Sequence, residues 1–329
     1  MAHVEDNSGA PATPAPPTSD AGRPRPRKAR RVSAFAQPHT ATFSPGRTAF
    51  WFLLPTAVVL ALFLYYPMLR TVALSLFSVR FYGQQQRFSG LENYVRLVTD
   101  PASYGSIVRT VVISGIVIVG SIGIALFLAA LLNQRIRGAR MYRLMLIWPL
   151  AMSTAISGIV FLVIFNPNFG LVNSALEPFG IQPEWFRDRT LAQIVMIIAL
   201  IWNRVGYNLV FYTAAYQTLP TDTLEAALVD GASPWQRFRH VTFPLLSPMT
   251  LFLLVTSTVF AFFDAYAIAE VFGGGPLDAT SILIFELTEN AFRNDRIGLA
   301  AAQSVLLFAA VAYITTVQLR QGRRRVTYQ

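Results

Sequence analysis

Apolar residues in this chain gather into six long runs that are separated by polar stretches. A transmembrane helix needs about 20 consecutive apolar residues, and runs of that length lie near residues 49–76, 107–133, 141–165, 191–218, 245–270 and 298–319. Because hydrocarbon offers no water to backbone N–H and C=O groups, each run should form a closed helix. The pattern predicts an all-α, polytopic membrane protein whose six transmembrane helices lie within residues 46–329.

Composition and charge place this protein in a membrane and orient it there. Hydrophobic residues make up 53% of the chain and charged residues only 13%, which excludes a water-soluble fold. The net charge of +10 comes from arginines that crowd alternate polar stretches: residues 23–31, 135–143, 237–239 and 320–325. By the positive-inside rule these stretches and both termini are cytoplasmic, so the charge indicates membrane lipid as a contact and no nucleic acid.

Residues 1–45 differ from the rest of the chain. They are rich in Pro, Ala, Ser and Arg and contain scarcely any aliphatic run. Such a segment cannot bury enough apolar surface to offset the entropy lost on ordering, so it should be a disordered, basic cytoplasmic tail. The chain has no cysteine, which excludes disulfides and thiolate metal sites, and no metal site is expected.

The most specific motif lies in the polar stretch of about residues 219–244, between the fourth and fifth runs. It reads E-A-A-x-x-D-G-A, with Phe and Pro at fixed positions further on. Pro220 should end the fourth span, Thr221 or Asp222 should cap a short helix, and Glu225 should fall in its first turn. Gly231 accepts a positive φ and should end that helix.

This stretch resembles the EAA loop of ABC importer permeases of the carbohydrate-uptake type. The resemblance implies the type I ABC importer permease fold in a bacterial plasma (inner) membrane, and a loop that docks on an ATPase subunit. The implied partners are a second permease in a heterodimer, two ATPase subunits and an extracytoplasmic solute-binding protein. The residues that carry this coupling would be Glu225, Ala226, Ala227, Asp230, Gly231, Phe238 and Pro244.

A transport subunit of this kind would perform no covalent chemistry, and no catalytic residue is expected. The chain contains no G-x-x-x-x-G-K-[ST] phosphate-binding string. This chain should therefore bind no cofactor, and ATP and Mg would be used by the partner ATPase. An intramembrane hydrolase would need a base or metal ligands at membrane depth, but His3, His39 and His240 all lie outside the apolar runs.

Polar residues within the fourth and fifth runs are candidates for a substrate path, since such side chains usually face a cavity or a partner. Asn203, Arg204, Tyr207 and Asn208 are spaced by three and four, so they should share one helical face. The Arg204 guanidinium suits a phosphate, because its planar donors can engage two oxygens. An internal salt bridge with Asp264 is the alternative.

Resemblance within the family adds further candidates and a substrate. Tyr207, Ser257, Phe260 and Asp264 match positions that line the sugar site of the maltose-importing permease, which has a small residue in place of Arg204 and an amide in place of Asp264. Strings at residues 206–209, 262–264, 301–305 and 325–329 resemble permeases of sn-glycerol-3-phosphate importers. The resemblance implies import of sn-glycerol-3-phosphate or glycerophosphodiesters. The alternatives are import of a neutral sugar or oligosaccharide, and a proton-coupled secondary transporter that uses Asp264.

Overall fold

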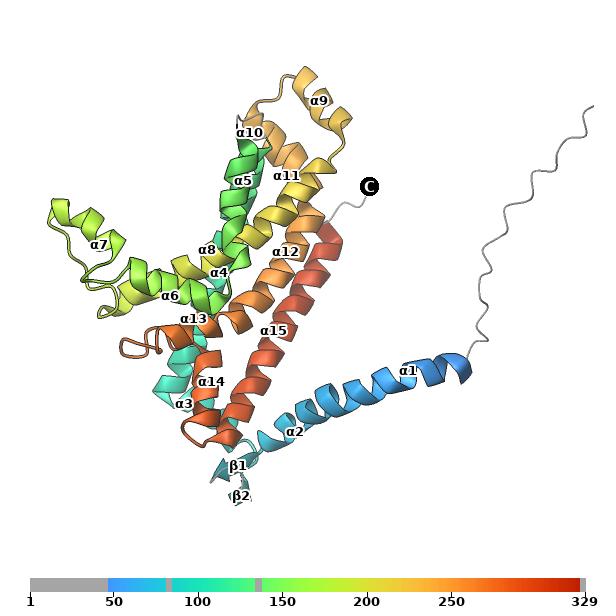
Figure 1. Ribbon diagram of the computed structural model, residues 1–329. Helices are drawn as coiled ribbons and strands as arrows, with labels where there is room; N and C mark the ends of the chain where they lie inside the picture. The colour runs from blue at the N-terminus through green and yellow to red at the C-terminus, as the bar shows by residue number, and fades with distance from the viewer. Residues whose placement is uncertain (1–46, 81–84, 134–137, 326–329) are drawn as a thin grey trace, which may run out of the picture. The chain divides into compact units, whose positions relative to one another are not determined.

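The computed structural model describes residues 47–80, 85–133 and 138–325. The predicted tail, with its arginines at 23–31, and the C-terminal string 326–329 lie outside these ranges. Helices dominate the described residues (Figure 1), as the all-α prediction requires, and one short hairpin is added to them. The chain divides into two units, Met1–Val58 and Val59–Gln329, and the packing below concerns the second.

Five of the six predicted spans are continuous helices long and apolar enough to cross a membrane. Two of them contain a π-helical turn, in which the backbone bonds reach one residue further than in an α-helix. The spans are α1 Arg47–Leu60, continued by η1 Ala61–Tyr65 and α2 Tyr66–Leu74; α4 Pro101–Leu132; α8 Arg189–Gln217; α12 Ser247–Val259, continued by η5 Phe260–Asp264 and α13 Tyr266–Val271; and α15 Ile297–Arg325.

The third predicted span is broken, which corrects the expectation of one straight helix over 141–165. It consists of α5 Ala139–Ile147, a 3₁₀ turn η2 Trp148–Ala151 that contains Pro149, and α6 Thr154–Ile164. The two halves meet at 106°. The break has a local cause, because the Ser153 hydroxyl accepts the Ile156 N–H at 3.3 Å and begins a new helix.

Shorter elements connect the spans. A hairpin of β1 Phe77–Arg80 and β2 Gln85–Phe88 pairs antiparallel with Phe77 opposite Phe88, and α3 Glu92–Thr99 follows it. Outside the segment between α8 and α12, the other elements are α7 Leu171–Leu176, η3 Glu177–Phe179 and α14 Leu283–Phe292. The Asn93 amide holds the hairpin to the preceding helix end by donating to the Ser75 and Phe77 carbonyls, at 2.9 and 3.0 Å.

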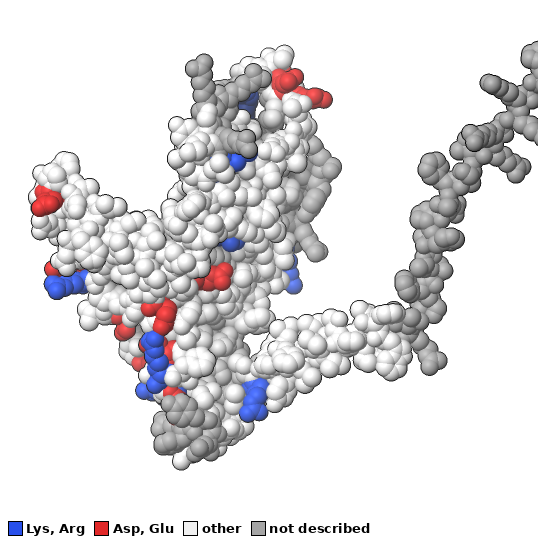
Figure 2. All heavy atoms as spheres, viewed as in Figure 1, with Lys and Arg blue, Asp and Glu red and all other residues white. Residues whose placement is uncertain are grey.

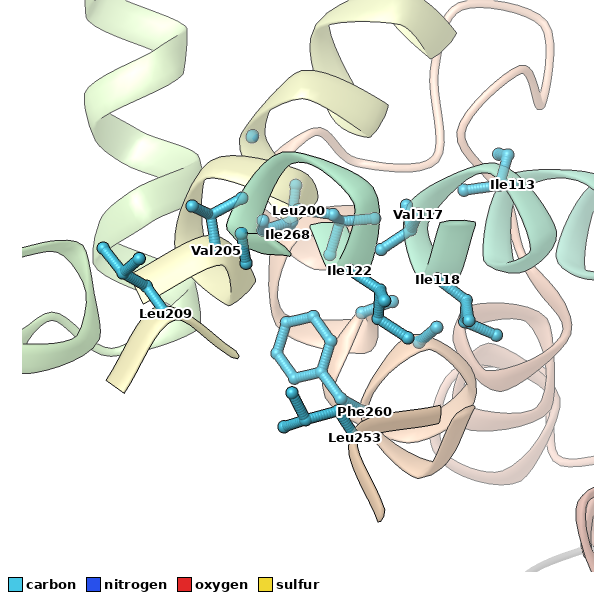
Figure 3. Close-up of a cluster of buried hydrophobic side chains, with 14 of the residues drawn as sticks. Ile113, Val117, Ile118, Ile122, Leu200, Val205, Leu209, Leu253, Phe260 and Ile268 are labelled. Carbon is cyan, nitrogen blue, oxygen red and sulfur yellow. The ribbon is translucent and has the colours of Figure 1, made fainter. Parts of the chain in front are cut away.

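The core lies where α8 packs along α4, the most extensive helix contact in the second unit. Branched aliphatic side chains of α4 and α8 meet those of α12 and α13 there, and Figure 3 shows them pointing toward one another. Beside this core, α4 and α5 each pack on α8 and border an apolar groove of about 350 Å³.

Charge is sparse on the face that Figure 2 displays, where white spheres cover most of the long helices. Many large apolar side chains of these helices are exposed, among them Val119, Phe127 and Ile159. Exposed apolar surface on this scale suits hydrocarbon or an apolar protein partner rather than water. The chain is therefore a multi-pass membrane protein.

Candidate functional site

The segment between α8 and α12 folds into four short helical pieces. They are α9 Thr221–Val229, α10 Pro234–Arg237, η4 Phe238–Thr242 and α11 Phe243–Leu245. Pro220 itself occupies the N-cap position of α9, and no side chain caps that helix. The expected cap by Thr221 or Asp222 is therefore wrong, and Glu225 lies in the second turn rather than the first, because the helix already begins at Thr221.

Gly231 ends α9, as the sequence predicted. Its φ is +75°, and the Gly231 N–H donates to the Leu228 carbonyl while the Ala232 N–H donates to the Ala227 carbonyl, each at 3.1 Å. These two bonds form a Schellman motif, which satisfies carbonyls that the helix leaves open. Directly afterwards Ser233 begins α10 in a reciprocal capping box with Gln236. The polar segment thus has a well-defined backbone.

The surface of this segment mixes acidic, small and apolar side chains. Glu225, Ala226, Asp230, Gly231 and Pro244 are exposed, whereas Ala227 and Phe238 are half-buried. Large apolar side chains are exposed beside them: Leu228 is 53% exposed, Val229 87% and Trp235 65%. A stacked pair, Trp235 and Phe238, with ring centroids 5.8 Å apart, supports that surface. Exposed apolar side chains on a rigid polar loop are typical of a protein docking site.

Arg204, near the middle of α8, is held by an unusual set of neighbours. Its guanidinium carbon lies 3.9 Å from the centroid of the Tyr207 ring and 4.9 Å from that of Phe260. Its Nε donates to the Ser257 hydroxyl at 3.4 Å. Two aromatic faces stabilise the cation through their quadrupoles. These contacts bring together four of the predicted path residues: Arg204, Tyr207, Ser257 and Phe260.

Asp264 does not form an ion pair with this cation, although the two opposite charges are near enough to interact electrostatically. It is exposed at the end of η5, and none of the ion pairs between described residues joins it to Arg204. The alternative of an internal Arg204–Asp264 salt bridge is therefore not the arrangement in this structure. Arg204 is left half-buried in an apolar span without a carboxylate at ion-pair distance.

The two asparagines expected beside Arg204 are both buried. Asn208 donates to Ser121 on α4 at 3.3 Å and accepts from Ser257 on α12 at 3.3 Å, so it shares Ser257 with Arg204. Asn203 instead donates to Ser157 on α6 at 2.8 Å, so the expectation of one common face is wrong for Asn203. Ser257 is also almost fully buried. Direct contact with substrate remains a prediction for all seven path residues.

Two serines that reach α8 escaped the sequence analysis, although both carried a signal. Ser121 and Ser157 are polar residues within otherwise apolar runs, where an unsatisfied hydroxyl is costly. Their partners depend on which helices lie side by side, which spacing along one helix does not reveal. Within the described residues, no group of three or more His, Asp or Glu side chains lies close enough to hold a metal ion.

Comparison with known proteins agrees with this architecture. Residues 121–325 match the family model described as "Binding-protein-dependent transport system inner membrane component". The chain is similar to "sn-glycerol-3-phosphate transport system permease protein UgpA" of three bacteria. It is 33% identical to that of Yersinia pestis bv. Antiqua over 290 residues, which cover 87% of this chain and 98% of the relative. It is 35% identical to that of Brucella abortus over 288 residues (87% and 98%), and 36% identical to that of Agrobacterium fabrum over 275 residues (83% and 94%).

Solved structures agree on the fold. A chain of a bacterial ABC transporter involved in the import of the acidic polysaccharide alginate superposes with a TM-score of 0.74 at 20% identity, covering 85% of this chain and 96% of that chain. The same transporter in complex with an alginate pentasaccharide-bound periplasmic protein gives 0.74 at 20% identity, covering 84% and 94%. At that identity the likeness shows the type I permease fold alone. Together with the family match over residues 121–325, it establishes that this chain belongs to the binding-protein-dependent transport system inner membrane components, the permease subunits of ABC importers.

Proposed function

We propose that this chain is one of two permease subunits of an ATP-driven importer for sn-glycerol-3-phosphate or a glycerophosphodiester. The single observation that carries the substrate class is the Arg204 cation at mid-span, which contacts two rings and a hydroxyl and, among the described residues, has no carboxylate at ion-pair distance. Burying a charge in an apolar medium is costly unless it is paired, so a transient anionic ligand is the natural partner. The printed names of the similar permeases favour the same substrate.

The remaining assembly follows from the exposed segment between α8 and α12. Its acidic and small residues, with Leu228 and Val229 beside them, suit a groove on an ATPase subunit. That docking orients the segment and both termini toward the cytoplasm. A second permease would complete the path, and an external binding protein would deliver the ligand. ATP and Mg²⁺ would bind to the two ATPase subunits, and this chain would carry no catalytic site.

The test is the ATPase activity of the complex of both permeases and two ATPase subunits, reconstituted with its binding protein. The ligand panel comprises sn-glycerol-3-phosphate, glycerophosphodiesters and neutral sugars. We expect stimulation by the phosphorylated ligands alone. Stimulation by sugars alone would overturn the substrate and keep the permease assignment, whereas uptake that is indifferent to ATP hydrolysis would indicate a proton-coupled transporter.

Variants of Arg204 test the site itself. Arg204→Ala removes the whole guanidinium, including the pair of donors proposed to bind phosphate, so transport of the phosphorylated ligand should fall by roughly a hundredfold or more with assembly intact. Arg204→Lys retains a point charge without the planar pair of donors, so the loss should be about tenfold. Arg187→Ala is the matched control, because Arg187 is exposed and, within the described part of the chain, forms its ion pair with Glu184 alone. Normal transport by Arg204→Ala would remove Arg204 from the path.

A further inference from the structure

A continuous chain of buried polar side chains runs from α4 through α8 and α12 to Arg204. The Arg204 Nε donates to Ser257 at 3.4 Å, Ser257 donates to the Asn208 Oδ1 at 3.3 Å, and the Asn208 Nδ2 donates to Ser121 at 3.3 Å. Ser121 in turn donates to the Ile118 carbonyl at 3.3 Å. Ser121 and Asn208 are 0% exposed and Ser257 is 1% exposed, so water does not compete for these bonds.

The direction of every bond in this chain follows from Arg204, whose guanidinium can only donate. The Ser257 oxygen accepts from Arg204, so its single proton must go to another acceptor, which is the Asn208 Oδ1. The Asn208 amide is thereby oriented with its Nδ2 toward Ser121. If the amide were flipped, the Ser257 proton would face an N–H donor and would lose its acceptor. The network therefore has one self-consistent arrangement, and Arg204 is one end of it.

We propose that Ser257, Asn208 and Ser121 are positioning residues that aim the Arg204 guanidinium at the ligand phosphate. This inference rests on the function proposed above. Ser257 takes the Nε donor, and the Tyr207 and Phe260 rings lie 3.9 and 4.9 Å from the guanidinium carbon. The terminal nitrogens, beside Tyr207, are the donors left for a ligand. The edge that carries them is the one that engages two phosphate oxygens at once. Fixing it before the ligand arrives reduces the entropy lost on binding.

A simpler alternative is that this network of hydrogen-bonded side chains only holds α4, α8 and α12 together. The neighbouring residue offers a direct comparison, because Asn203 donates to the buried Ser157 on α6 at 2.8 Å and has no bond to Arg204. Both pairs join an α8 asparagine to a buried serine on another helix. A purely adhesive role predicts equal consequences for the loss of Ser157 and of Ser257, whereas positioning predicts that only Ser257 affects the substrate.

The experiment compares Ser257→Ala, Ser257→Thr and Ser157→Ala in the full complex with its binding protein, reconstituted in proteoliposomes. The measured quantity is sn-glycerol-3-phosphate taken up per ATP hydrolysed, with the midpoint of thermal unfolding recorded for each variant. We expect Ser257→Ala to lower this ratio about tenfold. Ser257→Thr, which keeps the hydroxyl, should stay within twofold of the wild type. Ser157→Ala should also stay within twofold, even if its stability falls as far as that of Ser257→Ala.

Equal ratios for Ser257→Ala and Ser157→Ala would overturn the positioning role. If Ser257→Ala does not assemble, Ser121→Ala provides the same test, because Ser121 is the last side chain of the hydrogen-bonded network. An unchanged ratio for Ser121→Ala would also refute the proposal. Failure of the proposed function is distinguishable, because it would appear as normal uptake by Arg204→Ala. A requirement for Arg204 together with an unchanged ratio for the serine variants would reject the positioning role alone.

Discussion

Glu286 on α14 makes a strong link to α4 that can be tested by substitution. Its carboxylate accepts hydrogen bonds from Ser103, at 2.6 Å, and from Ser106, and both serines are 0% exposed. Glu286→Ala would leave two buried hydroxyls without this acceptor. The substitution should therefore loosen α14 on the end of α4 that follows α3.

The expected loss in the free energy of unfolding follows from these contacts. A hydrogen bond to a charged group contributes about 1.5–3 kcal/mol, so two would give about 3–6 kcal/mol if they were additive. Two effects lower this figure. The Glu286 side chain is half-exposed in the folded protein, and its carboxylate regains full contact with water on unfolding. Side-chain hydrogen bonds measured in a membrane protein also average only about 0.6 kcal/mol. We therefore expect Glu286→Ala to lower the free energy of unfolding by about 2–3 kcal/mol, and Glu286→Gln, which keeps one acceptor oxygen, by about half as much.

The assay is unfolding in mixed detergent micelles by SDS titration, followed by tryptophan fluorescence. A double-mutant cycle with Ser103→Ala isolates the pair, and its coupling energy should be about 1 kcal/mol. The control is Glu184→Ala, which removes an exposed carboxylate paired with Arg187 and should cost less than about 1 kcal/mol. A Glu286→Ala protein as stable as the wild type, or a coupling energy of zero, would refute the reasoning.

Two glycines give further predictions. Gly231→Ala should cost about 1–2 kcal/mol of local strain at φ +75° and reduce ligand-stimulated ATPase activity. Gly231→Asn should have a smaller effect, because asparagine tolerates this conformation better. Equal ATPase activities of the two variants would contradict this. Gly206 lies where an added Cβ would approach the Leu146 carbonyl oxygen to 3.2 Å, so Gly206→Leu should push α8 from α5 and lower the unfolding temperature. Gly123→Leu, at a site with open space, is the matched control and should leave that temperature nearly unchanged.

Much of this fold could be predicted because its signals are local. Hydropathy located the spans, since apolar length alone decides whether a helix can cross hydrocarbon. The helix end at Gly231 could also be predicted, because a helix end that needs a positive φ selects glycine. Hydropathy could not reveal the break in the third span, because the mean hydropathy of the whole run stays high across Met152 and Ser153. The Ser153 cap nevertheless begins a new helix there, and the two halves meet at 106°.

The sequence by itself determined the membrane class, the helical fold, the polar segment between the fourth and fifth spans and the presence of a cation within the fourth span. Only the tertiary structure decided what surrounds that cation. Spacing placed Asn203, Arg204 and Asn208 near one another on α8, but α6 supplies the partner of Asn203, α12 that of Arg204, and α4 and α12 together those of Asn208. The physical reason is that hydropathy is a property of one helix, whereas a hydrogen bond between spans requires two helices to meet at the right depth and rotation. Arg204 thus contacts two aromatic rings rather than forming an ion pair with Asp264 because of how α8 packs against α12 and η5.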